Sequence, residues 1–281
     1  MRTVFFFLII ALSQPIIGTK IKKIDSKNVE IVLALDVSNS MNTKDLSQNF
    51  SRLDIVKRAL IQFLNQLSGE KIGISVFAGA SYVQLPITED YSAAKLFVNE
   101  ISSTMISNQG TDISAAIQTA KNMFSEKKCN KIVLLMTDGE HHEGDLSEST
   151  EDIQQKELQF LVVGIGSKTG GFIPKVADRP EFGYKKDENS QNVVSKLNKN
   201  LIIDIAKQTH GSYTFINNSF PDIYHFFTSI KKSKSFQNSI EKNSIEMKVR
   251  KRFYSYFLLF SGGFLILFFL LNSLFYKKEK D

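Results

Sequence analysis

Hydrophobic residues along the chain alternate between short unbroken runs and longer stretches with helical spacing. Unbroken runs of this length predict strands that are buried on both faces of a parallel sheet. They cover residues 30–35, 72–77, 131–136 and 158–165, with shorter candidates at 81–85 and 211–216. Apolar residues at intervals of three and four predict the helices between them. These cover residues 53–67, 92–101, 113–124 and 201–209, and a last helix begins at Pro221.

This alternation places residues 28–231 in one α/β domain. Strands that alternate with helices predict a Rossmann-like, doubly wound and mostly parallel sheet with helices on both faces. The stretch between residues 166 and 200 is long and polar, which is typical of a functional or mobile loop, and a small hairpin is possible over 183–194.

Two apolar stretches lie outside the domain. Residues 4–12 form a short apolar run after Arg2, so we expect residues 1–19 to be a signal peptide or an N-terminal membrane anchor. Residues 253–276 are 24 residues without a charge, and tyrosines lie near both ends. About 20 apolar residues cross a bilayer as a helix, so we predict a C-terminal transmembrane helix over 253–276. Residues 277–281 are then a short basic tail.

The net charge of +6 is concentrated beside this second apolar stretch. Residues 231–252 contain eight basic and two acidic residues. A nucleic-acid-binding protein would carry its basic excess on the folded domain, so no nucleic-acid partner is expected. We interpret residues 232–252 as a basic juxtamembrane segment, which either flanks the span or binds anionic headgroups.

Oxygen-bearing side chains gather where two of the predicted strands end. Asp36-Val37-Ser38-Asn39-Ser40 follows the first strand, and Thr137-Asp138-Gly139 follows the strand over 131–136. Because ligands bind beyond the carboxyl ends of parallel strands, Asp36 and Asp138 can converge. Alternate residues of a tight loop can direct the hydroxyls of Ser38 and Ser40 to one point, as a hard divalent cation requires.

Two hydroxyls and one carboxylate are too few to hold such an ion, so other loops must contribute. Asp138 offers a second carboxylate, and Thr111 offers a third hydroxyl just before a predicted helix. The alternative is a cluster of helix caps and turns. That alternative explains each residue singly but does not explain the set.

These motifs resemble the von Willebrand factor type A family over roughly residues 28–231. In that family the same motifs form a metal-ion-dependent adhesion site, and the matching residues here are Asp36, Ser38, Ser40, Thr111 and Asp138. The resemblance implies that the three hydroxyls bind one Mg²⁺ or Mn²⁺ directly. The two aspartates would act mainly through water and hydrogen bonds. One open position on the ion would then accept an Asp or Glu carboxylate of a protein partner.

A closer resemblance is to the membrane-bound A-domain proteins of bacterial aerotolerance (Bat) operons. It is carried by Leu33–Met41, Lys44-Asp45, Arg52-Leu53, Phe77–Ser81, Gly110–Ile113, Gly183–Asp187, Ser195–Leu197 and Gly211–Tyr213. It implies a non-enzymatic, metal-dependent binding module in a bacterial envelope complex, with other A-domain or repeat proteins as possible partners. The first alternative is a cell-surface adhesin that binds an acidic residue of a host or matrix ligand.

The second alternative is a metal-dependent hydrolase, which needs a base or nucleophile near the ion. Only His141 and His142 are near in sequence, and they could instead rim the site and touch a partner. A separate zinc site lacks further spaced ligands, since only His210 and His225 remain. The glycines at 164 and 166 lack phosphate-loop spacing and predict a turn.

The orientation of the domain follows from two opposing signals. A signal peptide would export the domain, whereas the basic residues before the span favour the cytoplasmic side. Because the charge rule weakens for long translocated domains, we expect the domain on the extracytoplasmic, periplasmic side of a bacterial cell membrane, with one or two passes. The single cysteine, Cys129, excludes an intramolecular disulfide and does not indicate a compartment.

Overall fold

A computed structural model of the chain describes most of the predicted domain and parts of both ends. The described residues are 16–25, 29–127, 129–140, 158–177, 179–219, 221–224, 228, 244–252, 259–263 and 265–266. They fall into two compact units, one within Lys27–Asn243 and one made from the two ends of the chain. The expectations for residues 1–15, 232–243 and 277–281 therefore lie outside the described residues.

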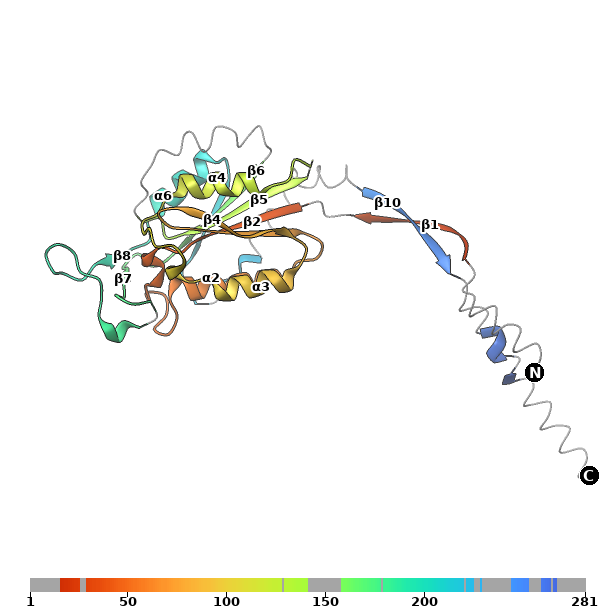
Figure 1. Cartoon of the computed structure of the whole chain (residues 1–281), viewed down its shortest axis with the longest axis horizontal. Helices are drawn as coiled ribbons and strands as arrows, with labels where there is room; N and C mark the ends of the chain where they lie inside the picture. Colours follow the sequence, from red (N-terminus) through yellow and green to blue (C-terminus); the bar gives the residue numbers. More distant parts are fainter. Residues whose placement is uncertain are drawn as a thin grey trace, which may run out of the picture. The chain divides into compact units, whose positions relative to one another are not determined.

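A six-stranded sheet forms the centre of the larger unit (Figure 1). Its strand order is β4-β3-β2-β5-β6-β9. The bounds are β2 (Val29–Asp36), β3 (Lys71–Phe77), β4 (Ser81–Thr88), β5 (Asn130–Thr137), β6 (Leu158–Ile165) and β9 (Ser212–Ile216). All neighbouring pairs are parallel except β3 and β4. The predicted doubly wound, mostly parallel sheet is confirmed.

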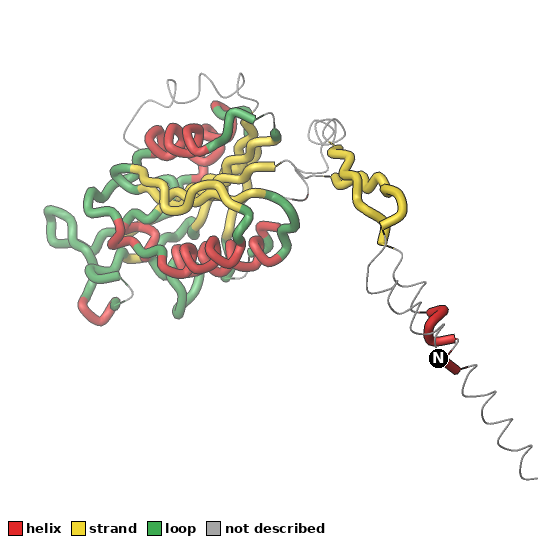
Figure 2. The backbone as a smooth tube through the Cα atoms, turned by 45° about the vertical axis from the view of Figure 1, so that its right-hand side comes forward, coloured by secondary structure: helices red, strands yellow, loops and turns green. Residues whose placement is uncertain are grey.

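Helices cover both faces of this sheet (Figures 1 and 2). They are α2 (Arg52–Asn65), α3 (Tyr91–Glu100), α4 (Ile113–Met123) and α6 (Lys199–Gln208). Successive residues of β2 point to opposite faces, so Ile31 and Leu33 join the core under α2 and α3, whereas Val32 and Ala34 join the core under α4 and α6. Every residue of β2 is therefore buried, which explains its unbroken apolar run.

Two elements differ in extent from the sequence prediction. The strand predicted to end before Pro86 continues through it to Thr88. Proline is tolerated there because β4 lies at the edge of the sheet, where one side of the strand needs no hydrogen-bonded neighbour. Of the helix predicted from Pro221, residues 223, 224 and 228 are helical, and the others from 225 on lie outside the described residues.

After β6 the chain leaves the sheet and returns to it at α6. We call residues 167–198 the β7–β8 excursion, because β7 (Gly171–Phe172) pairs with β8 (Val194–Ser195) at its base. The hairpin expected over 183–194 is present, since the Asp187 amide donates to the Gln191 carbonyl (2.9 Å) and the Val193 amide donates to the Lys185 carbonyl (2.9 Å). Short 3-10 helices also occur at η1 (Asn39–Asn42), η2 (Ser103–Met105) and η3 (Pro180–Phe182).

The second unit contains an antiparallel pair of strands from opposite ends of the chain. β1 (Ile16–Asp25) pairs with β10 (Ser244–Arg252), and Lys23 is the register partner of Glu246. Sequence patterning does not indicate this pair, because both segments are rich in charge and their pairing is not local. Of the helix predicted over 253–276, residues 259–263 and 265–266 are helical and the others lie outside the described residues. Within the described part of the chain, no helix has the length and apolarity required to cross a bilayer.

Candidate metal centre

The turn that follows β2 brings two hydroxyl groups together. The Ser38 amide donates to Asp36 Oδ1 (2.9 Å), and this hydrogen bond folds the chain back directly after the strand. The Oγ atoms of Ser38 and Ser40 are then 3.0 Å apart, and both residues are buried. The Val37 amide donates to the Phe77 carbonyl (2.8 Å), which fixes this turn against the end of β3. The alternate serines therefore converge at the carboxyl end of the sheet.

Thr137 joins this turn to the neighbouring strand. As the last residue of β5, it donates from Oγ1 to Asp36 Oδ2 (2.5 Å) and accepts from the Gly139 amide (3.0 Å). Asp138 follows directly, and its side chain is fully buried, as is that of Asp36. The sequence analysis did not assign a role to Thr137, although the residue is part of the Thr-Asp-Gly motif. The structure thus links Asp36, Ser38 and Ser40 to the strand that carries Asp138.

Thr111 lies in a loop that is fastened to the same edge of the sheet. The Asp112 amide donates to the carbonyl of Ala78, directly after β3 (2.7 Å), and the Gly79 amide donates to the Asn108 carbonyl (3.0 Å). Asp112 then caps α4 by accepting from the Ala115 amide (2.9 Å). Thr111 is buried between these two attachments. Asp36 is thus the last residue of β2, and the other four predicted residues lie in loops at the same edge of the sheet.

An arginine that the sequence analysis did not assign to the site completes its buried charges. Arg52 is fully buried and donates from Nη1 to Asp138 Oδ2 (2.8 Å). Its Nε and Nη2 atoms donate to the two oxygens of Asp45 (2.9 and 2.7 Å). Periodicity could not reveal this role, because an arginine in the first turn of an amphipathic helix is normally solvent-exposed. The only signal was the presence of Lys44-Asp45 and Arg52-Leu53 among the Bat-like motifs.

Among the described residues, the fully buried charges of this centre do not balance when all of them are ionised. The side chains of Asp36, Asp45, Asp138 and Arg52 are all without solvent exposure. When ionised they carry three negative charges and one positive charge. Burial, and then the nearby charge of Asp138, raise the pKa of Asp36 from 3.8 to about 7, although hydrogen bonds from Ser38 and Thr137 oppose the shift. One divalent cation would balance the remaining two negative charges.

The donor atoms also suit such an ion. Hydroxyl and carboxylate oxygens are the ligands that Mg²⁺ and Mn²⁺ prefer. The part of the chain that the structure describes contains no group of three or more His, Cys, Asp or Glu residues arranged for a metal. Of the five candidate residues, Ser38, Ser40 and Thr111 offer hydroxyl oxygens, and Asp36 and Asp138 offer carboxylate oxygens. His141 and His142 lie outside the described residues, so their expected place at the rim stays a prediction.

Arg52 also connects the centre to the β7–β8 excursion. Its Nη1 donates to Ser195 Oγ (2.6 Å), and its Nη2 donates to the Ser195 carbonyl (3.1 Å). At the other end of the excursion, the Ser167 amide donates to Asp45 Oδ2 (2.7 Å). The Asn198 amide donates to the Asp138 carbonyl (2.9 Å). Both ends of the excursion are thus attached to residues of the candidate metal centre.

Gly166 provides a test of how tightly Arg52 is enclosed. It has a φ of +133°, and a Cβ at this position would lie 2.9 Å from Arg52 Cζ and Nε. Gly183 also has a positive φ, of +89°, but no atom lies within 4 Å of its Cβ position. We expect Gly166→Ala to lower the free energy of unfolding by roughly 1–3 kcal/mol more than Gly183→Ala, because only the first substitution forces a collision. Equal urea midpoints for the two variants would show that the guanidinium can move aside.

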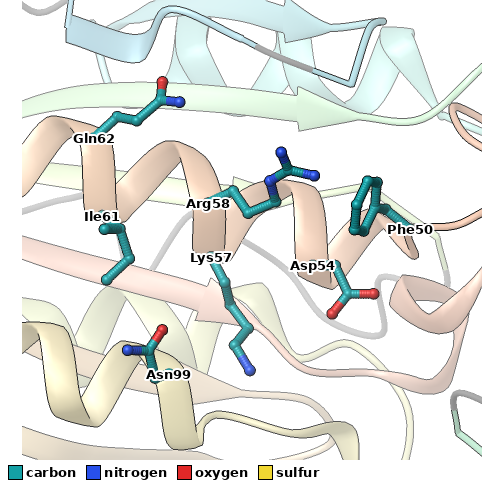
Figure 3. Close-up of a pocket in the computed structure, with 7 residues that line it drawn as sticks. All are labelled: Phe50, Asp54, Lys57, Arg58, Ile61, Gln62 and Asn99. Atoms are coloured by element: carbon teal, nitrogen blue, oxygen red, sulfur yellow. The ribbon is translucent and has the colours of Figure 1, made fainter.

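A separate groove lies along α2 (Figure 3). It is lined by Phe50, Asp54, Lys57, Arg58, Ile61, Gln62 and Asn99. The Arg58 guanidinium lies over the Phe50 ring at 4.2 Å, and Lys57 Nζ donates to the Ile101 carbonyl (2.9 Å). Asp54 accepts from the Ser51 amide (2.9 Å) in the cap of α2. Phe50, Asp54, Lys57 and Arg58 thus make structural contacts, and the groove contains none of the predicted metal residues.

Comparison with known proteins agrees with this architecture. The model of the von Willebrand factor type A domain family matches residues 31–141. The crystal structure of the conserved hypothetical protein BatB from Bacteroides thetaiotaomicron is 33% identical, with a TM-score of 0.65, and the match covers 76% of this chain and 100% of that chain. An aerotolerance-related membrane protein from Bacteroides fragilis NCTC 9343, solved with multiple mutations to serines, is also 33% identical. Its TM-score is 0.63, with the same two coverages.

A more distant relative spans nearly the whole chain. An uncharacterized protein of Borreliella burgdorferi (strain ATCC 35210 / DSM 4680 / CIP 102532 / B31) is 22% identical over 282 residues. That match covers 96% of this chain and 76% of the relative.

Proposed function

Because the chain belongs to the Bat-type von Willebrand factor A proteins, we propose that it is a membrane-anchored module that binds a protein partner through one divalent metal ion. The observation that carries this proposal is the buried charge imbalance beside two adjacent serine hydroxyls at the carboxyl end of the sheet. A centre with this imbalance is costly to bury without a cation. We propose a binding role for it, without catalysis.

The hydrogen bonds of the centre support a division of roles among its residues. Asp138 already accepts from Arg52 at one carboxylate oxygen and from the Glu140 amide (3.1 Å) at the other. Asp36 likewise accepts at both oxygens, from the Ser38 amide and from Thr137. We therefore propose that Ser38, Ser40 and Thr111 are the direct ligands of Mg²⁺ or Mn²⁺ and that both aspartates act mainly from the second coordination shell.

The partner follows from the charge of such a site. Three neutral hydroxyls leave the charge of a bound divalent ion largely uncompensated in its first coordination shell, so an external carboxylate is a favourable ligand. We propose that a partner protein supplies this carboxylate from an Asp or Glu side chain. Other A-domain or repeat proteins of an envelope complex remain the expected class of partner.

Membrane anchoring is supported by the C-terminal segment. Residues 253–276 contain no charge, and among the described helical residues Leu259 is 74% and Ile266 is 62% exposed. Exposed apolar side chains on a helix favour a lipid environment over water. We expect the domain to face the extracytoplasmic side, so an added protease should digest it in intact spheroplasts. Resistance before lysis, followed by digestion after lysis, would contradict this orientation.

The metal-dependent function can be tested with the full chain in detergent micelles. We expect titration calorimetry to detect binding of Mn²⁺ or Mg²⁺ and Thr111→Ala to weaken it at least about tenfold, since losing even an outer-shell partner of a metal site typically costs about 10–100-fold. Thr104→Ala, which changes an exposed threonine of η2, is the matched control and should leave the affinity unchanged. Absence of binding at millimolar metal, with a folded protein, would refute the proposal.

A further inference from the structure

The β7–β8 excursion exposes a group of apolar side chains. Phe172 is 46%, Val194 is 44% and Tyr184 is 37% exposed. Phe172 and Val194 are register partners in the β7–β8 pair, and the rings of Phe172 and Tyr184 lie 5.2 Å apart. These three residues therefore form one continuous surface, which we call the aromatic surface. Exposed apolar groups of this kind commonly mark sites of protein interaction.

The aromatic surface lies on a small, well-fixed β structure. The Ile173 amide donates to the Val193 carbonyl (3.3 Å), and the Lys185 amide donates to the Ile173 carbonyl (2.9 Å). Pro174 and Tyr184 form a further antiparallel bridge. Ile173, between the exposed Phe172 and this bridge, is buried. The surface is thus held in shape before any partner arrives, which reduces the entropy lost on binding.

The same structure is packed directly against the candidate metal centre. The alternation of side chains along β8 exposes Val194 and buries Ser195, which accepts a hydrogen bond from Arg52. Gly171 lets β7 lie close to the turn that carries the serines, because a Cβ at this position would lie 2.8 Å from Thr43 Cγ2. Figure 1 shows β7 and β8 at the end of the sheet where β2 and β5 terminate. One guanidinium group therefore separates the strand of the aromatic surface from Asp138.

We propose that the aromatic surface is a second contact site for the partner whose carboxylate is bound at the metal. Its occupant is a protein segment in which an Asp or Glu lies next to a large apolar residue. This inference rests on the proposed metal-dependent function and adds the sequence preference of the partner. The excursion contains six basic and four acidic residues, a net charge of +2, and its exposed Lys186 and Lys196 are complementary in charge to such an acidic segment. Arg52 is the positioning residue that fixes the surface relative to the metal.

The probe for this proposal is a displayed library of short random peptides. It is screened against the full chain in detergent micelles with millimolar Mn²⁺ and eluted with EDTA. We expect the enriched peptides to contain an Asp or Glu with a large apolar residue within a few positions. Phe172→Ser combined with Tyr184→Ser should weaken an enriched peptide about tenfold or more, because aromatic contacts dominate such interfaces. Leu96→Ser, at a 67% exposed leucine of α3, is the matched control and should not change the affinity.

The outcomes separate this inference from the proposed function. Acidic peptides without apolar neighbours, an unaffected double variant, or no enrichment above a protein-free control would each overturn the aromatic surface. In the first two cases elution by EDTA would still support the metal-dependent function. Peptides that stay bound in EDTA but do not bind the double variant would refute the metal-dependent function. They would still support the aromatic surface as a contact site. Circular dichroism of each variant verifies that it is folded.

Discussion

Replacing Arg52 with alanine is expected to lower the free energy of unfolding of the metal-free protein by about 3–5 kcal/mol. The guanidinium is fully buried and makes hydrogen bonds to Asp45, Asp138 and Ser195. Its removal leaves the buried carboxylates of Asp45 and Asp138 without a counter-charge and removes a hydrogen-bond donor from Ser195. Urea unfolding of the full chain in detergent, followed by circular dichroism, measures the change.

Two further variants make this expectation specific. Arg179→Ala removes an exposed arginine of the excursion and should change stability little. Arg52→Lys should recover only part of the loss, since a single ammonium cannot reproduce the paired contacts to both oxygens of Asp45. A midpoint for Arg52→Ala equal to that of the wild type would mean that the buried ion pairs contribute no net stability.

Replacing Asp36 with asparagine is expected to have opposite effects on the metal-free and metal-bound proteins. The pKa of Asp36 is raised by burial and by Asp138 to about 7, above its ordinary value of 3.8. The native state therefore binds the Asp36 proton more tightly than the unfolded state does. As pH rises from about 4 to 7, ionisation of Asp36 lowers the stability of the native state progressively. Above pH 7 the buried Asp36 carboxylate is ionised and destabilises the native state fully. Asp36→Asn should therefore raise the free energy of unfolding of the metal-free protein by about 1–3 kcal/mol.

The same substitution should remove the response to metal. In the wild type at pH 8, we expect Mn²⁺ to raise the melting temperature and EDTA to lower it, because a ligand that binds only the native state stabilises it. In Asp36→Asn the two melting temperatures should coincide. Asp204→Asn, at an exposed aspartate of α6, should behave like the wild type in both conditions. A lower metal-free stability of Asp36→Asn at pH 8 would show that its hydrogen bonds outweigh the repulsion.

The sequence alone determined the sheet, because its parallel strands are buried on both faces. Residues of β2 such as Val32 and Leu33 face opposite cores, and this requirement gives an apolar run that is visible without a structure. The alternation of such runs with amphipathic helices then specified the α/β class. Asp36 and Asp138 could also be placed at one edge of the sheet from the sequence, because the carboxyl ends of parallel strands lie at the same edge.

The tertiary structure decided which charges the centre must balance. Arg52 in α2 meets Asp138 after β5 and Ser195 in β8, and hydrophobic periodicity contains no information about partners so distant in sequence. The pairing of β1 with β10 is of the same kind, because strands from opposite ends of a chain leave no local signal. The exposed rings of Phe172 and Tyr184 are a third case. Their contact depends on backbone bridges within a polar loop, and its apolar residues are too sparse to form a pattern.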